Sequence, residues 1–79
     1  MNEFYLIDLK EGEKAIIASI VGGWQATKRL ADLGLTPETK IKLLRKAFWG
    51  GPIEVEVRGS RFVLGRGLAS KILVKKYAE

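Results

Sequence analysis

The sequence predicts a mainly β protein, specifically a small β-barrel with one inserted α-helix and a short helical turn before the last strand. Short β-branched or alternating segments recur with glycine or proline between them, as in small β folds. A single segment, residues 24–33, has apolar residues at helical spacing instead. The 79 residues include no cysteine and are 47% hydrophobic, so we expect one domain, residues 1–79, held together by apolar packing.

The N-terminal part alternates between apolar segments and turns. Residues 4–9 form a short apolar segment, and residues 10–12 predict a turn that ends in glycine. Ala15–Val21 is short, β-branched and followed by two glycines. This pattern favours a strand that is buried on both faces.

The helical segment carries a clear ending. Ala26, Leu30 and Leu33 recur at helical spacing, and Gly34 stands where a left-handed residue ends a helix. If Gly34 holds that position, Leu35 contacts Leu30, as in a Schellman motif. We therefore expect Leu30, Leu33 and Leu35 to pack against the barrel.

The second half predicts the remaining strands. Pro37 begins a turn, residues 41–47 predict a strand, and the glycines and proline of residues 48–52 predict a loop. Residues 53–58 alternate between apolar and charged side chains, and residues 72–76 predict a last strand after a helical turn near residues 66–71.

A two-residue turn is predicted between residues 53–58 and the strand that follows. Glycine in the first position favours a type II′ turn at Gly59-Ser60. That register places Val57 opposite Phe62 on the buried face and Arg58 opposite Arg61 on the solvent face.

The charge is unevenly distributed along the chain. The net charge is +5, and residues 40–79 hold ten of the 14 Lys and Arg residues but only three of the nine acids. A basic half is compatible with nucleic acid, an anionic lipid surface or an acidic protein partner. The longest apolar run, residues 15–21, is far shorter than the about 20 residues that span a bilayer. With no signal-peptide pattern and no cysteine, the sequence suggests a cytoplasmic protein.

Several kinds of chemistry lack their usual residues. Without histidine or cysteine, the chain has no thiol nucleophile, no histidine base and no zinc site of the usual type. Glu54 and Glu56 share a strand face about 7 Å apart and are weak candidates for a hard cation. Such residues are far more often solvent-facing, and the serines have no base to activate them. We therefore expect a non-enzymatic protein without a cofactor.

The glycine- and arginine-rich segment Val57–Lys71 raises the question of phosphate binding. It lacks both the G-x-G-x-x-G dinucleotide pattern and the G-K-[ST] of a P-loop. Its glycines instead predict a hairpin and a chain reversal.

Two aromatic residues stand in the predicted loop. Phe48 and Trp49 precede Gly50 and Gly51, and a loop has no need of apolar bulk. Either one ring folds back over an open end of the barrel, or the pair forms a protein-interaction tip. Binding of RNA through exposed aromatics is less well supported, because Phe62 falls on the buried face.

Three motifs, in this order, resemble the FeoA family, the small cytoplasmic component of bacterial ferrous-iron uptake. They are "RLADLGLTP" (Arg29–Pro37), "GGPIEVEVRG" (Gly51–Gly59) and "LGRGLASKILV" (Leu64–Val74). The resemblance spans nearly the whole chain. It departs at Glu38, where the family usually has glycine after "TP".

The resemblance implies an SH3-like barrel with one inserted helix, acting beside FeoB, a large membrane protein with a cytoplasmic GTPase domain. Similar modules form the C-terminal domain of iron-dependent repressors. The family is associated with transition metal binding, which these residues do not support.

The leading hypothesis is a non-catalytic accessory protein of ferrous-iron uptake. It would bind the cytoplasmic part of a FeoB-type transporter, be peripheral to the membrane through that partner, and modulate its assembly or activity. Weak self-association stays open, and nucleic acid is not the expected partner. The predicted partner surface consists of Leu35, Phe48, Trp49, Gly50 and Gly51. The alternatives are a small basic barrel that binds RNA or DNA, and a metal-responsive regulatory module like the repressor domain.

Overall fold

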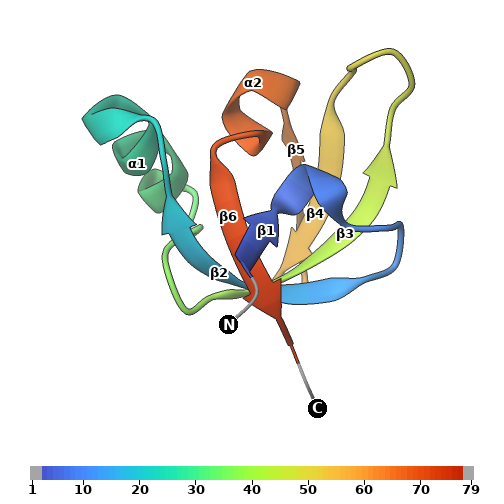
Figure 1. The fold of residues 1–79 in the computed structure, drawn as a ribbon, viewed down its shortest axis with the longest axis horizontal. Coiled ribbons are helices and arrows are strands. Elements are labelled where there is room, and N and C mark those ends of the chain that lie inside the picture. Colours follow the sequence, from blue (N-terminus) through green and yellow to red (C-terminus); the bar gives the residue numbers. More distant parts are fainter. Residues whose placement is uncertain (1–2, 78–79) are drawn as a thin grey trace.

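The computed structural model describes residues 3–77, in which six antiparallel strands form one sheet. The elements in chain order are β1 (Glu3–Tyr5), the 3-10 turn η1 (Leu6–Asp8), β2 (Lys14–Ile20), α1 (Gly23–Asp32), β3 (Lys40–Lys46), β4 (Ile53–Val57), β5 (Ser60–Leu64), α2 (Arg66–Ala69) and β6 (Ile72–Lys76). The strand order is β1-β6-β2-β3-β4-β5 (Figure 1). The predicted helix, the short helical turn and the last strand are all confirmed.

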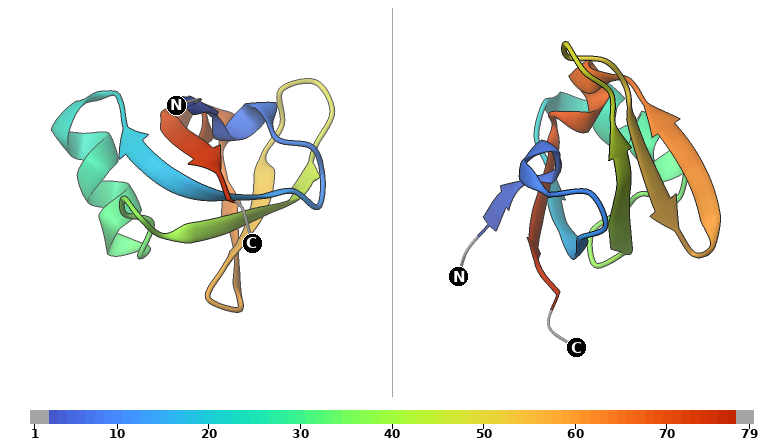
Figure 2. Two further views of the ribbon diagram at one scale, coloured as in Figure 1. Left: turned by 60° about the horizontal axis from the view of Figure 1, so that its bottom comes forward. Right: turned by 90° about the vertical axis from the view of Figure 1, so that its right-hand side faces the viewer.

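The sheet curls on itself around the core (Figure 2). Register shifts interrupt the β2–β6 pairing between Ile17 and Ser19 and the β3–β4 pairing between Leu43 and Arg45. Such bulges bend a strand and increase its twist. The predicted mainly β, barrel-like fold is confirmed, although the sheet is not closed and β1 and β5 remain its edges.

One apolar core fills the inside of the curled sheet. The strands contribute alternate side chains, while Leu6 from η1, Leu30 from α1 and Ala69 from α2 cover it from the ends. The buried strand residues are Ala15, Ile17, Ile41, Leu43, Ile53, Val55, Val57, Leu64, Ile72 and Val74. The alternation predicted for residues 53–58 is confirmed, since the apolar members are buried and the glutamates half-buried.

Strand β2 is not buried on both faces, contrary to the prediction. Ala15 and Ile17 are buried, but Ile16 between them is only half-buried. Ile16 lies opposite Lys40 on one neighbouring strand and Lys75 on the other. Lysine stems cover apolar neighbours only in part while their charged heads stay in water.

The end of α1 confirms the predicted Schellman motif. The N–H of Leu35 donates to the carbonyl of Leu30 at 2.8 Å, and Gly34 has a φ of 84°. Leu30 and Leu35 are fully buried, whereas Leu33 is 40% exposed. Leu33 therefore does not pack as predicted. It is the last residue before the reversal at Gly34, at the edge of the apolar stripe.

The β4–β5 hairpin has a different turn from the predicted one. Its central residues are Arg58 and Gly59, with φ of 54° and 81°, so Val57 pairs with Ser60. Arg61 then lies opposite Glu56 instead of Arg58. Opposite charges favour this register, since like charges directly opposite each other destabilise a sheet. The guanidinium of Arg58 also donates to the carbonyl of Gly34 at 3.3 Å, which holds Arg58 in the turn.

The turn between α1 and β3 explains why glycine suits the position of Glu38. The N–H of Thr39 donates to the carbonyl of Thr36 at 3.2 Å, and Glu38 has a φ of 72°. This is the third position of a type II turn after proline, where positive φ favours glycine. The Glu38 carboxylate lies 3.3 Å from Lys75 Nζ, an exposed ion pair that compensates only weakly.

The turn before β2 is held by Glu13. The backbone N–H of Lys10 donates to its carboxylate at 2.7 Å, and this hydrogen bond, aided by nearby Lys76, lowers the pKa of Glu13. The charged form is therefore favoured in the folded state. Its contribution to stability is present above the unfolded-state pKa and is lost as the pH falls through the lowered one.

The different burial of two leucines at the end of α1 predicts different losses of stability when each is replaced by alanine. Leu30→Ala should reduce the free energy of unfolding by about 2–5 kcal/mol, because it leaves a cavity in a fully buried site. Leu33→Ala, the matched control, should cost about 1 kcal/mol or less. Urea unfolding of both variants measures this, and equal costs would contradict the assignment.

The left-handed conformation of Glu38 predicts that glycine is preferred over alanine at this position. Glu38→Gly and Glu38→Ala both remove the ion pair with Lys75, but only glycine relieves the strain of a φ of 72°. The glycine variant should be more stable than the alanine variant by about 1 kcal/mol. Thermal unfolding compares the two directly, and an alanine variant of equal or greater stability would exclude backbone strain at this turn.

Candidate partner-binding site

The loop between β3 and β4 is an ordered hairpin tip. Trp49 and Gly50 have φ of 62° and 73°, and the N–H of Gly51 donates to the carbonyl of Phe48 at 3.1 Å. Positive φ at both central residues is typical of a type I′ turn. The N–H of Ala47 donates to the carbonyl of Pro52 at 3.1 Å and extends the hairpin to the base of the loop. The backbone therefore holds the two aromatic residues in a defined place.

Both aromatic side chains of this tip project into solvent. Phe48 is 86% exposed and Trp49 is 100% exposed. The interpretation in which one ring closes the open end of the barrel is therefore wrong. A bulky residue in the left-handed region is a genuine outlier, and such strain is concentrated at functional sites. No packing of the Trp49 ring within the described residues accounts for its conformation.

Two features keep the base of the tip in place. A Cβ added at Gly51 would lie 2.8 Å from the Cβ of Ala47, so only glycine fits there without a shift. The guanidinium of Arg66, at the start of α2, donates to the carbonyl of Ala47 at 3.3 Å. The arginine that suggested phosphate binding in "LGRG" thus supports the aromatic loop.

A small hollow lies beside the base of the tip. It has a volume of about 180 Å³ and is lined by Arg45, Ala47, Pro52, Glu54 and Val63. Val63, on edge strand β5, is 69% exposed. The hollow adds an apolar surface and an arginine to the two aromatic rings. Together with Phe48 and Trp49, its lining residues form what we call the aromatic tip surface.

Leu35 does not belong to the aromatic tip surface. It is fully buried at the end of α1, where the Schellman motif turns its side chain into the core. Figure 1 shows α1 and the β3–β4 loop on opposite sides of the molecule. The predicted partner surface is therefore corrected, with Leu35 removed and Val63 in its place.

Trp24 is an exposed aromatic residue that the sequence analysis missed. It lies in the first turn of α1 and is 73% exposed. The sequence feature that indicates its exposure is its position two residues before Ala26. At helical spacing this places it nearly opposite the apolar stripe formed by Ala26 and Leu30. It lies on the far side from the aromatic tip and serves below as a matched control.

The two candidate carboxylates for a metal have cationic neighbours. Glu54 Oε2 lies 3.7 Å from a guanidinium nitrogen of Arg61, and Glu56 is the Cα partner of both Lys42 and Arg61. No group of three or more acidic side chains that could hold a metal ion occurs within residues 3–77. The carboxylates balance charge on the sheet surface.

The curled sheet and the aromatic tip surface define a small SH3-like domain with a candidate protein-binding loop. The chain belongs to the FeoA domain family, whose model matches residues 4–76. No helix within residues 3–77 has the length and apolar character needed to cross a bilayer.

Comparison with known proteins finds FeoA-type relatives and further proteins that share the fold. It is 39% identical over 66 residues to "Putative Fe(2+) transport protein A" of Methanocaldococcus jannaschii, covering 84% of this chain and 78% of that protein. A crystal structure of an iron uptake regulatory protein, FeoA, matches with a TM-score of 0.87 and 37% identity, over 96% of this chain and 100% of that one. A manganese-dependent transcriptional repressor in complex with manganese matches with a TM-score of 0.89 and 22% identity, over 98% of this chain and 38% of that one. The repressor shares the fold alone.

The surroundings of Glu54 and Glu56 predict no strong response to metal. A metal ion at 100 times the Kd of a true site would add about 2.7 kcal/mol to the free energy of unfolding. This raises the melting temperature of a domain this small by about 10 °C or more. We expect Fe²⁺, added without oxygen, and Zn²⁺ to leave the melting temperature nearly unchanged. Each is used at 100 µM, which is roughly 100 times a micromolar Kd. A saturable rise that disappears in Glu56→Gln would establish a metal site there.

Proposed function

We propose that this chain is a non-catalytic accessory protein of ferrous-iron uptake. It binds the cytoplasmic part of a FeoB-type membrane transporter through the aromatic tip surface and modulates the assembly or activity of that transporter. Membership of the FeoA family supports this role, as does the name of the relative in Methanocaldococcus jannaschii, a transport protein for Fe²⁺. The location that follows is the cytoplasm, at the membrane only through the partner.

The observation that carries the proposal is the exposure of Phe48 and Trp49 on a fixed turn. An aromatic side chain buries about 150–250 Å² in an interface and loses little rotamer freedom on binding. Tryptophan and tyrosine are enriched among the few residues that supply most of the energy of an interface. Because the hydrogen bonds of the hairpin already order the loop, little further entropy is lost when a partner binds.

The surroundings of the tip favour a protein partner with acidic character. Arg45 and Glu54 both line the adjoining hollow, and Glu54 lies 3.7 Å from the guanidinium of Arg61. Arg66 supports the loop, so positive charge exceeds negative charge around the tip. Arginine beside aromatic residues is typical of the centre of protein interfaces. An apolar centre with cations at its edge fits a partner surface that has apolar pockets and a carboxylate rim.

The two alternatives receive less support. For RNA, Phe62 packs against the core and both tip aromatics lie beyond the end of β3, so among residues 3–77 no row of exposed rings follows a sheet face. For a metal-responsive module, the chain lacks the histidine and cysteine ligands that sensors of transition metals use. A metal-responsive module also leaves the exposed tryptophan at a strained turn unexplained.

The proposal predicts that replacing Trp49 weakens binding, whereas replacing the other tryptophan does not. Trp49→Ala should weaken binding to the purified cytoplasmic domain of the transporter by about 2 kcal/mol or more, or roughly 30-fold in Kd. Trp24→Ala removes an equally large exposed side chain from the opposite side and should leave the Kd unchanged. Titration calorimetry measures both variants, and unchanged melting curves confirm that both are folded.

Two results would reject this assignment. If Trp24→Ala weakens binding and Trp49→Ala does not, the interface is centred on α1. If added RNA displaces the transporter domain from the wild-type protein, the surface is a nucleic-acid site.

A further inference from the structure

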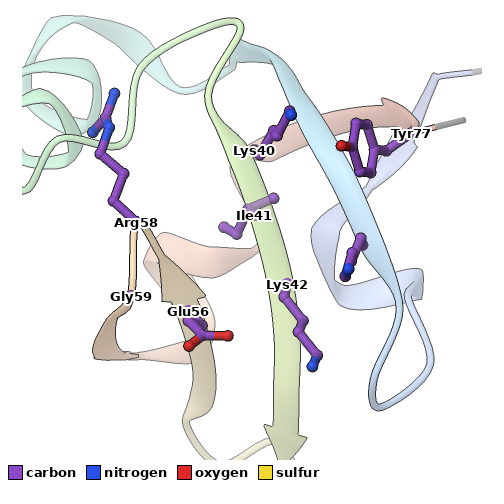
Figure 3. A pocket seen from close by; sticks show the side chains of 8 residues that line it. Lys40, Ile41, Lys42, Glu56, Arg58, Gly59 and Tyr77 are labelled. Atoms are coloured by element: carbon purple, nitrogen blue, oxygen red, sulfur yellow. The ribbon is translucent and has the colours of Figure 1, made fainter. Parts of the chain in front are cut away.

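A second hollow lies on the outer face of the sheet, along the first residues of β3 (Figure 3). Its volume is about 290 Å³, and its charged lining is almost entirely basic. The lining includes Lys14, Lys40, Lys42, Arg58, Glu56 and Tyr77. These residues come from β2, from β3, from β4 and its following turn, and from the chain after β6, so only folding brings them together. We call this site the basic hollow.

The strand register brings like charges together in the basic hollow. Lys14 on β2 and Lys42 on β3 are direct Cα partners, and Lys40 lies two residues before Lys42 on the same face. Like charges directly opposite each other destabilise a sheet. Natural proteins break local rules of this kind mainly at functional sites.

The walls of the basic hollow are held in place. Lys40 Nζ lies 4.7 Å from the centre of the Tyr77 ring, a cation–π contact that fixes both side chains at one wall. At the other wall, the hydrogen bond from Arg58 to the carbonyl of Gly34 uses one of five guanidinium N–H groups. A neighbouring hollow of about 360 Å³ shares Lys40 and Arg58 but adds Thr39 and the acidic Glu38, so the excess of positive charge is centred on the basic hollow.

We propose that the basic hollow binds an oligophosphate group, either the phosphate chain of a small ligand or phosphates clustered at a lipid surface. Its volume is at the low end of the range for small-molecule sites, about 300–1,000 Å³, which excludes a bulky ligand. The lining contains three lysines and one arginine against a single glutamate, and this excess of positive charge favours a ligand with several negative charges in a compact group. Linked phosphates provide that charge density, and lysine binds phosphate as a point charge.

Glu56 limits the affinity of the basic hollow for anions. Its carboxylate is in the lining, and its Cα partner on β3 is Lys42. It thereby offsets part of the repulsion among the lysines when the hollow is empty and repels an incoming phosphate. Removing this charge should therefore strengthen anion binding, an effect that loss of a merely structural carboxylate would not produce.

The test measures binding of inorganic tripolyphosphate by titration calorimetry in low salt. Lys42→Gln and Lys14→Gln should each raise the Kd roughly tenfold, as expected when a charge-assisted contact is lost. Glu56→Gln should lower the Kd. Lys28→Gln makes the same change in net charge on α1, where Lys28 lies 3.5 Å from Asp32, and should have no effect. Melting curves check that each variant is folded.

The probes also distinguish the two sources of phosphate. Binding of tripolyphosphate without Lys42-dependent binding to phosphatidylglycerol vesicles identifies a soluble ligand, and Lys42-dependent vesicle binding identifies a lipid surface. The proposal is overturned if Lys28→Gln weakens binding as much as Lys42→Gln, because the effect is then one of net charge. It is also overturned if citrate or poly-glutamate binds as tightly as tripolyphosphate, or if single-stranded RNA binds much more tightly.

Discussion

The shared apolar face of the six strands is the constraint on which the rest of the structure depends. With no cysteine in the chain, the packing of side chains such as Ile17, Leu43 and Val55 stabilises the curled sheet without a disulfide. The bulge after Leu43 bends β3 across this core and so aims its two ends in different directions. The end of β3 carries the aromatic tip, and its start forms the floor of the basic hollow. Both proposed surfaces therefore follow from the path of one strand.

Within residues 3–77, three residues other than glycine adopt the left-handed conformation, and each adjoins a proposed surface. Trp49 presents the aromatic tip, Arg58 forms a wall of the basic hollow, and Glu38 lines the hollow next to it. Glycine would fit all three turns at lower conformational cost. A side chain kept at a strained position provides a contact that glycine cannot make, so backbone geometry and surface chemistry independently indicate the same regions.

The sequence predicted local features well because single motifs determine them. The ending of α1 at Gly34 and the alternation of residues 53–57 depend on neighbours within one turn or strand. The β4–β5 register could not be derived locally, because a contact from Arg58 to the distant Gly34 and the pairing of Glu56 with Arg61 decide it. The same limit applies to the sites. The exposure of the tip was one of two open interpretations. The burial of Leu35 followed from the predicted Schellman motif and already argued against including Leu35 in the partner surface.

The basic hollow was least accessible to sequence reasoning, because Lys14 and Tyr77 are separated by nearly the whole chain. Its distance from the aromatic tip bears on how the two surfaces act together. The aromatic rings lie beyond the end of β3, roughly 20 Å from its start at the strand rise of about 3.3 Å per residue. The two hollows lie closer together, because Glu54 lines one and Glu56, about 7 Å away on the same face of β4, lines the other. This separation is within the Debye length of about 8 Å at physiological ionic strength, so a bound oligophosphate acts electrostatically on the hollow beside the tip but leaves the two aromatic rings accessible. On the two proposals taken together, the chain can hold a protein partner at one end of β3 and a phosphate-bearing ligand at the other.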